Sequence, residues 1–289
     1  MVKRLEWTPE LVERFWNGLA ELPVLEEMSF ARGAAPYLLP LVERFVPADA
    51  RAIDFGGGGG HLVEALLDRG IRAAAYEPSQ ARARAISDRL EAKSGFLGVV
   101  GPESDTRFDA LFCLEVIEHV TDRQTPSLLA HWRGLLADDA IVILTCPNRE
   151  NLASGTVYCP NCDSAFHRWQ HMRSLSCGDV VDTLTAAGFE TLWLGLVGFE
   201  VGPALLDWAK NQERPDNFCY DASRRLYIET SGPCPDPTWR TSAPHDVDLR
   251  QGSEHNIVYV GRKLPSGAMP MARVAGVRTR LRAPVAASE

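Results

Sequence analysis

Three groups of residues in this chain could carry chemistry. The first is an uninterrupted run of glycines at positions 56–60, and the second is the acidic, histidine-containing stretch 115–120, which reads E-V-I-E-H-V. The third is a C-P-N-C turn formed by residues 159–162. Glycine backbone can lie directly against a ligand, carboxylates with imidazoles can move protons or bind cations, and paired thiolates bind zinc. The chain therefore has the residue types for a cofactor loop, a catalytic centre and a metal centre.

The glycine run lies between two expected strands. A short apolar strand ends at Asp54, an amphipathic helix follows the glycines, and a second strand ends at Glu77. Flanking strands argue against a flexible linker. In this arrangement, the acidic residue that closes the second strand holds a ribose diol, because a carboxylate accepts two hydroxyl hydrogen bonds. The first half of the chain is therefore predicted to bind a cofactor that contains adenosine.

The spacing of the glycines bears on the identity of that cofactor. A dinucleotide fingerprint needs glycine at position 61, which is His61 here. The alternative frame D-x-G-x-G-x-G is satisfied by Asp54 and the glycines 56, 58 and 60. This frame resembles motif I of the class I S-adenosylmethionine (SAM) dependent methyltransferases. The loop alone leaves the dinucleotide frame open, and His61 counts against it.

Downstream segments extend the resemblance. Residues 108–115 look like the fourth strand of that fold and run into E-V-I-E-H-V, and residues 140–145 look like the fifth strand, followed by C-P-N-R. Together they resemble the branch with the ubiquinone-biosynthesis O-methyltransferases and the small-RNA 2′-O-methyltransferases, over about residues 40–195 and 256–262. The resemblance implies SAM as cofactor and an α/β fold, a seven-stranded Rossmann-like methyltransferase sheet. The implied cofactor contacts are Asp54, Gly56, Gly58, Gly60, Glu77, Pro78, Leu114 and Glu115.

The E-V-I-E-H-V stretch allows three interpretations. If a helical turn starts at Leu114, then Glu115, Glu118 and His119 share one face. With a later histidine, matched here by His171, the small-RNA enzymes use this pattern to bind a metal, which implies Mg²⁺, Mn²⁺ or Fe²⁺. Alternatively, His119 alone is the general base, with Glu118 orienting it and Glu115 near the cofactor. In the third interpretation the stretch is a purely structural turn.

The C-P-N-C turn predicts zinc, because it brings two thiolates to one edge of a tetrahedral site. Cys159, Cys162, His167 and His171 have the spacing C-x₂-C-x₄-H-x₃-H, enough ligands to close a structural site. His171 cannot serve both this site and the Glu115 group. A replacement ligand could come from Cys177, Cys219, Cys234 or His255.

These groups must be positioned by the surrounding elements. We expect an N-terminal helical cap over residues 1–46, with helices broken at Pro23, Pro36 and Pro40, and a SAM-binding domain over 47–262. Ser79 is expected to cap the helix that follows the second strand. Within the domain, residues 150–176 are the expected zinc loop, and 197–250 an insertion that shapes the acceptor pocket. Residues 263–289 are expected to form a mobile tail.

Composition limits the partners. The 289 residues carry a net charge of −8, which disfavours an extended nucleic-acid surface. No apolar run approaches the ~20 residues of a membrane span, and the cysteines fit a reducing compartment, so a cytoplasmic location is expected. The predicted function is methyl transfer from SAM to a hydroxyl of a small molecule, a sugar or a natural product. Alternatives are methylation of RNA ends and a non-catalytic assembly role, and a homodimer is compatible with the sequence.

Overall fold

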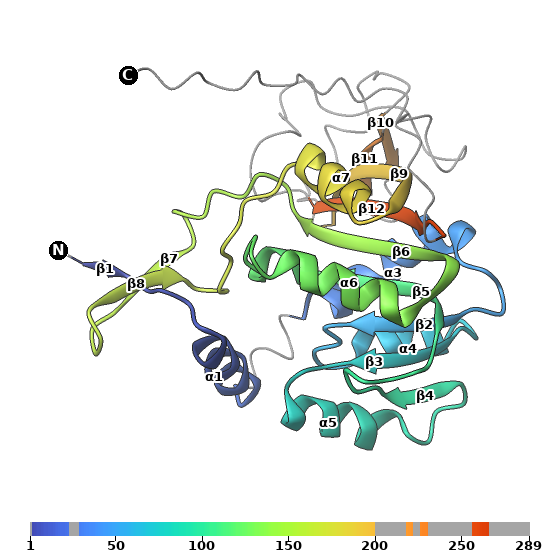
Figure 1. Cartoon of the computed structure of the whole chain (residues 1–289), viewed down its shortest axis with the longest axis horizontal. Coiled ribbons are helices and arrows are strands. Elements are labelled where there is room, and N and C mark those ends of the chain that lie inside the picture. Colours follow the sequence, from blue (N-terminus) through green and yellow to red (C-terminus); the bar gives the residue numbers. More distant parts are fainter. Residues whose placement is uncertain (1, 23–28, 200–217, 222–225, 231–255, 266–289) are drawn as a thin grey trace.

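A mixed β-sheet forms the centre of the computed structural model, which describes residues 2–22, 29–199, 218–221, 226–230 and 256–265 (Figure 1). The strand order in this nine-stranded sheet is β10-β11-β9-β12-β6-β5-β2-β3-β4. The strands are β2 (Arg51–Phe55), β3 (Arg72–Tyr76), β4 (Phe96–Val99), β5 (Phe108–Leu114), β6 (Leu136–Pro147), β9 (Phe189–Gly198), β10 (Phe218–Asp221), β11 (Leu226–Thr230) and β12 (Asn256–Lys263). The helices are α1 (Pro9–Ala20), α3 (Phe30–Val42), α4 (His61–Leu67), α5 (Gln80–Leu90), α6 (Thr125–Leu135) and α7 (Cys177–Ala186), with 3₁₀ turns η1 (Glu43–Phe45) and η2 (Ile117–His119).

The predicted seven-stranded methyltransferase sheet is confirmed as the core of this larger sheet. Strands β4, β3, β2, β5 and β6 are parallel to one another, and β12 enters antiparallel between β6 and β9. The hairpin β10–β11 then extends the sheet beyond β9. The rest of the predicted 197–250 insertion lies outside the described residues from position 200 on, as does the predicted tail from position 266.

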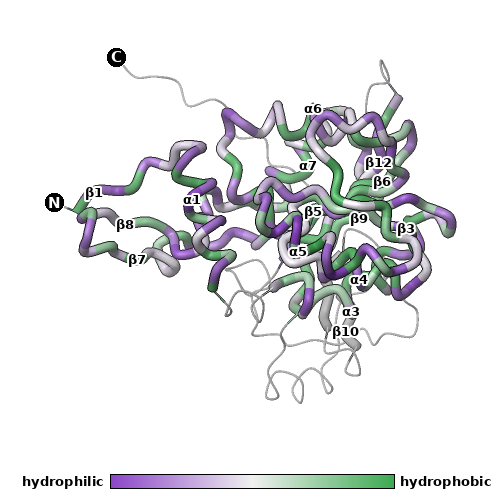
Figure 2. The backbone as a smooth tube through the Cα atoms, turned by 90° about the horizontal axis from the view of Figure 1, so that it is seen from below, coloured by the Kyte–Doolittle hydropathy of each residue, from purple (hydrophilic) through white to green (hydrophobic). Residues whose placement is uncertain are grey.

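The strands alternate their side chains between two hydrophobic layers, because successive residues of a strand face opposite sides. Ala52 and Phe112 pack with helices α3, α4 and α5, whereas Ile53 and Leu111 pack with α6 and α7. Figure 1 shows α6 and α7 together on one face of the sheet. Figure 2 shows hydrophobic colouring in the interior of the molecule, for example around β9. No helix within the described ranges is long and apolar enough to cross a membrane.

A second, smaller sheet stands beside the first (Figure 1). Its order is β1-β8-β7, from β1 (Lys3–Arg4), β7 (Thr156–Cys159) and β8 (Ser164–His167). The β7–β8 hairpin occupies the segment predicted as the zinc loop. An aromatic cluster joins it to α1: the Trp7 ring contacts Phe15 at 5.3 Å and Phe166 at 5.9 Å between centroids. The N-terminus and the hairpin therefore form one unit.

Two sequence predictions about helices are wrong. Helix α3 runs without interruption through Pro36 and Pro40, although each proline removes one backbone donor. Burial of one helix face, which includes Leu38 and Leu39, offsets that cost. Ser79 precedes α5 as predicted, but its side chain accepts no capping hydrogen bond. Its backbone N–H donates instead to a carboxylate oxygen of Glu77 at 2.9 Å.

Replacing Pro36 by alanine should stabilise the protein. Pro36 is exposed, so its ring contributes little packing, and alanine restores the N–H that can donate to the carbonyl of Arg32. A proline in a helix interior costs about 3 kcal/mol, and we expect a gain in unfolding free energy of about 1–3 kcal/mol. Urea unfolding measures it. Pro47→Ala, in the turn after η1, is the control and should show no comparable gain.

Candidate active site

The candidate site lies at one edge of the sheet, where parallel strands all end. The glycine loop follows β2, Glu77 follows β3, Glu115 follows β5, and Glu150 comes shortly after β6. Because β12 is antiparallel, its first residue, Asn256, pairs with the last residue of β6 and lies at this same edge. Parallel topology thus brings together polar residues that are far apart in sequence.

The glycine loop needs glycine for backbone geometry and for space. Gly56, Gly58 and Gly60 have φ values of +86°, +54° and +76°, in the left-handed region that side chains disfavour. The N–H of Gly56 donates to the carbonyl of Tyr76 at 2.8 Å, which ties the loop to β3. A Cβ atom at Gly56 would lie 2.6 Å from Cγ2 of Val116. The glycine loop therefore packs directly against the E-V-I-E-H-V stretch.

Glu77 closes β3 beside this loop. One oxygen of its carboxylate accepts from the N–H of Gly58 and the other from that of Ser79, both at 2.9 Å. Burial raises the pKa of Glu77. Asp54 is fully buried below the loop, and burial, reinforced by the charge of Glu77, raises its pKa to about 7. Glu77 thus lies beside the glycine loop, where the sequence predicts the ribose site, and Asp54 lies beneath it.

Glu115 does not share a face with Glu118 and His119, which corrects that expectation. The helical turn covers only residues 117–119, and Glu115 has φ +54°. Its carboxylate accepts from the hydroxyl of Thr145 at 2.7 Å and from the amide of Asn256 at 3.0 Å. Burial raises the pKa of Glu115 to about 7. Glu115 therefore links β5 to β6 and β12.

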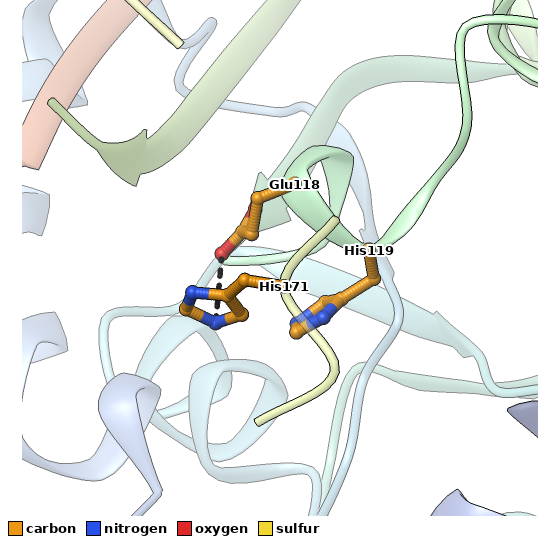
Figure 3. A group of neighbouring side chains, drawn as sticks. All are labelled: Glu118, His119 and His171. Carbon is orange, nitrogen blue, oxygen red and sulfur yellow. Dashed lines mark ion pairs between the residues drawn. The ribbon is translucent and has the colours of Figure 1, made fainter. Parts of the chain in front are cut away.

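Glu118, His119 and His171 do come together, as Figure 3 shows. One ligand atom from each lies within 4.8 Å of the others, and Oε1 of Glu118 is 4.0 Å from Nε2 of His171. Both carboxylate oxygens of Glu118 and Nδ1 of His119 are buried without a hydrogen-bond partner. Burial raises the pKa of Glu118 well above its usual value, and burial together with His171 lowers the pKa of His119 to about 3. These three residues form the central triad.

A second group shares His171 with the central triad. The Nδ1 atom of His171 lies 2.5 Å from Oε2 of Glu150, and Nε2 of His167 lies 3.4 Å from Oε1 of the same carboxylate. The two imidazole rings stack at 4.6 Å between centroids. Burial lowers the pKa of His167, with His171 as the next cause. Glu150 therefore connects the two histidines.

Helix α1 reaches the central triad through Trp16. The indole N–H of Trp16 donates to the side-chain oxygen of Gln170 at 2.9 Å, and the amide of Gln170 donates to the carbonyl of His119 at 3.1 Å. The rings of Trp16 and His119 meet edge to face at 4.9 Å. The first helix of the chain therefore covers one side of His119.

The predicted zinc ligands are split between the two ends of the β7–β8 hairpin. Cys159 pairs with Ser164 next to the turn, whereas His167 pairs with Thr156 at the opposite end. The structure therefore does not assemble Cys159, Cys162, His167 and His171 into one site. The two cysteines do lie together: the backbone N–H groups of Cys162 and Asn161 lower the pKa of the Cys159 thiol. Zinc at the cysteine pair stays a prediction.

Several site residues were not found by sequence reasoning. Glu150 carried a usable signal, because it lies shortly after a predicted strand at the ligand edge of the sheet. Thr145 ends a predicted strand and Asn256 starts one, but their contact with Glu115 depends on the antiparallel insertion of β12. Trp16 gave no signal, because its place over His119 depends on tertiary packing.

The comparison with protein families decides the assignment. The methyltransferase-domain family matches residues 30–201, more than half of the chain. The chain belongs to this family. The match runs from the start of α3 to the residues after β9, so it includes the glycine loop, Glu77 and the central triad of the methyltransferase domain.

Individual relatives are more distant. The ubiquinone biosynthesis O-methyltransferase of Azotobacter vinelandii is 29% identical over 120 residues, which cover 39% of this chain and 49% of that enzyme. The chain therefore spans about half the length of this curated relative. Among solved structures, the 1,6-didemethyltoxoflavin-N1-methyltransferase of Burkholderia thailandensis has a TM-score of 0.50 at 14% identity, over 91% of this chain and 94% of that one. A SAM-dependent methyltransferase of Methanosarcina mazei has a TM-score of 0.47 at 12% identity, over 78% and 97%. The Burkholderia structure shows a shared fold.

Gly56→Ala should destabilise the methyltransferase domain more than Gly70→Ala. Both glycines have positive φ, but a Cβ at Gly70 meets nothing within 4 Å, whereas one at Gly56 would overlap Val116. The backbone penalty common to both is about 1–2 kcal/mol, and overpacking adds about 1–3 kcal/mol at Gly56. Thermal and urea unfolding of both variants measure the difference. Equal losses would contradict the contact with Val116.

Proposed function

We propose that this methyltransferase-family protein uses SAM to methylate a hydroxyl group of a small molecule, a sugar or a natural product. The observation that carries the proposal is the central triad at the same sheet edge as the glycine loop and Glu77, with a Glu118 carboxylate that is buried without a hydrogen-bond partner. A cofactor region and a polar centre at one edge fit the transfer of a group between two bound molecules.

The residues at the glycine loop fit the proposed cofactor. The carboxylate of Glu77 accepts a hydrogen bond from the N–H of Gly58. If ribose hydroxyls replaced that donor, the carboxylate would still be hydrogen-bonded. The left-handed glycines leave the backbone bare beside it. SAM, when bound, supplies an electrophilic methyl group. Gly56, Gly58 and Gly60 would seat its methionine part, Asp54 would support the loop, and Pro78, Leu114 and Glu115 complete the proposed contacts.

The central triad fits a divalent cation. Two imidazoles and one carboxylate suit Mn²⁺ or Fe²⁺, and the oxygen donors alone would also suit Mg²⁺. A cation placed there would neutralise a carboxylate that otherwise lies buried without a hydrogen-bond partner. Such an ion supplies Lewis acidity toward the acceptor hydroxyl. Glu118, His119 and His171 would orient that hydroxyl, and Trp16 would limit the access of water to His119.

Two observations bear on the acceptor. The net charge of −8 favours a small molecule over a nucleic acid. Methylation of RNA ends is the second candidate, favoured by the presence of His171 beside Glu118 and His119, as the resemblance to small-RNA enzymes implies. A screen of short RNAs against saccharides and phenolic compounds separates the two. Transfer to RNA alone would contradict the small-molecule proposal.

Glu77→Ala should raise the Kd for SAM at least tenfold, which corresponds to about 1.4 kcal/mol. Loss of the carboxylate removes the proposed diol contact. Titration calorimetry with SAM measures the affinity, and melting curves without ligand check that the loop still folds. Glu190→Gln is the control, because Glu190 pairs with Arg262 at the other end of β12 and should leave the affinity unchanged. An unchanged Kd in Glu77→Ala would exclude Glu77 from cofactor binding.

His119→Ala should abolish turnover and cation binding while SAM affinity stays within about twofold of the wild type. The variant removes one ligand of the central triad but no residue of the glycine loop. Elemental analysis and Mn²⁺ titration measure the cation, and calorimetry measures SAM binding. Cys159→Ser is the matched variant: it should lose any zinc at the hairpin and keep the cation at the central triad. Full turnover in His119→Ala would rule out both active-site mechanisms for His119.

A further inference from the structure

The two groups of histidine and glutamate side chains share His171. The distance from His171 to the glutamate differs between the two groups. Atoms that bind one cation at ~2.1 Å lie about 3 Å or more from each other. Nδ1 of His171 and Oε2 of Glu150 are instead hydrogen-bonded to each other, and at 2.5 Å they are too close to be two ligands of one cation. On the other side, the 4.0 Å between Nε2 of His171 and Glu118 leaves room for an ion. Only the side of His171 that faces Glu118 therefore suits a cation.

Hydrogen bonds from two backbone N–H groups determine which ring nitrogen of His167 carries the proton. Its Nδ1 accepts from the backbone N–H of His171 at 3.2 Å and of Trp169 at 3.4 Å. A neutral imidazole that accepts at Nδ1 carries its proton on Nε2. Nε2 of His167 lies 3.4 Å from Oε1 of Glu150 and makes no hydrogen bond in this structure. In this tautomer Nε2 of His167 has no lone pair to offer a metal.

Packing holds His167 in that place. A Cβ atom at Gly155 would lie 1.9 Å from Nε2 of His167, so the ring lies directly on the glycine backbone. The side chain of Glu150 is only 11% exposed and that of His167 only 5%. Each oxygen of the Glu150 carboxylate therefore faces one histidine in a site with little water.

We propose that Glu150 is a positioning residue that holds His171 in the tautomer protonated at Nδ1. The Nε2 lone pair of His171 is then directed at Glu118, where the cation of the proposed function would bind. A carboxylate that accepts the second ring proton of a ligating histidine fixes its orientation and raises its basicity. His167 lies beside the other oxygen of Glu150 and stacks on the ring of His171. The effect of Glu150 on cation binding rests on the proposed function. The tautomer of His171 does not depend on it.

The tautomer can be measured directly. Long-range ¹H–¹⁵N spectra of the metal-free, full-length protein distinguish protonation at Nδ1 from protonation at Nε2. We expect His171 to be protonated at Nδ1 in the wild type and in Glu190→Gln, and to lose that preference in Glu150→Ala. A wild-type His171 protonated at Nε2 would overturn the proposal, whether or not the protein binds a cation.

The effect on the cation is measured by titration with Co²⁺ alone, followed by its visible absorption. Outer hydrogen-bond partners typically contribute 10- to 100-fold in metal affinity, so Glu150→Ala should weaken binding by that factor with unchanged stoichiometry. Glu150→Gln keeps one oxygen that can accept from His171 and should fall between Glu150→Ala and the wild type. This milder variant also serves if Glu150→Ala does not fold.

The outcomes separate the two proposals. If His119→Ala loses Co²⁺ but Glu150→Ala and Glu150→Gln bind it as tightly as the wild type, the role of Glu150 is wrong and the cation site stands. If the wild type binds no Co²⁺, Mn²⁺ or Mg²⁺, the cation site and the effect of Glu150 on it are both wrong. The tautomer measurement then still decides whether Glu150 sets the protonation of His171.

Discussion

The burial of the Glu118 carboxylate is the constraint on which the rest of the site depends. A buried carboxylate is costly unless it is protonated, paired or bound to a cation, and neither oxygen of Glu118 has a hydrogen-bond partner. The backbone nevertheless fixes it there: the N–H of Met172 donates to the carbonyl of Glu118, and Arg173 bonds the carbonyl of Ile117. Stability alone would favour an apolar residue at this position. The acid at this position therefore supports the proposed cation site.

The parallel sheet explains how such a centre forms. Ends of β2, β3, β5 and β6 deliver the glycine loop, Glu77, the turn at Glu118 and the loop with Glu150 to one edge. The left-handed conformation of Glu115 reverses the chain directly after β5 and directs Val116 against the glycine loop. Glu115 is held in turn by Thr145 and Asn256. The glycine loop is thus in direct contact with Val116, two residues before Glu118 of the central triad.

Much of this arrangement could be predicted from the sequence, and the exceptions have physical causes. The glycine loop and the place of Glu77 at the end of β3 follow from local spacing, because each depends on short-range periodicity. The seven-stranded sheet followed from the resemblance to the methyltransferases. His171 was predicted beside Glu118 from the resemblance to the small-RNA enzymes. The predicted zinc ligands combined residues from the two ends of the β7–β8 hairpin, because spacing along the chain does not reveal strand register. The breaks predicted at Pro36 and Pro40 are absent, because burial of α3 against α4 outweighs the backbone hydrogen bonds that the prolines remove.

The Trp16–Gln170 contact spans 154 positions along the chain and fastens the first helix to the far end of the hairpin. Closing a long loop costs more chain entropy than closing a short one, so this contact forms at a larger entropic cost than contacts between neighbouring residues. Local openings of this kind cost less free energy than unfolding of the whole fold. Detachment of α1 alone would therefore expose the imidazole of His119 to solvent while the strands of the main sheet stay paired.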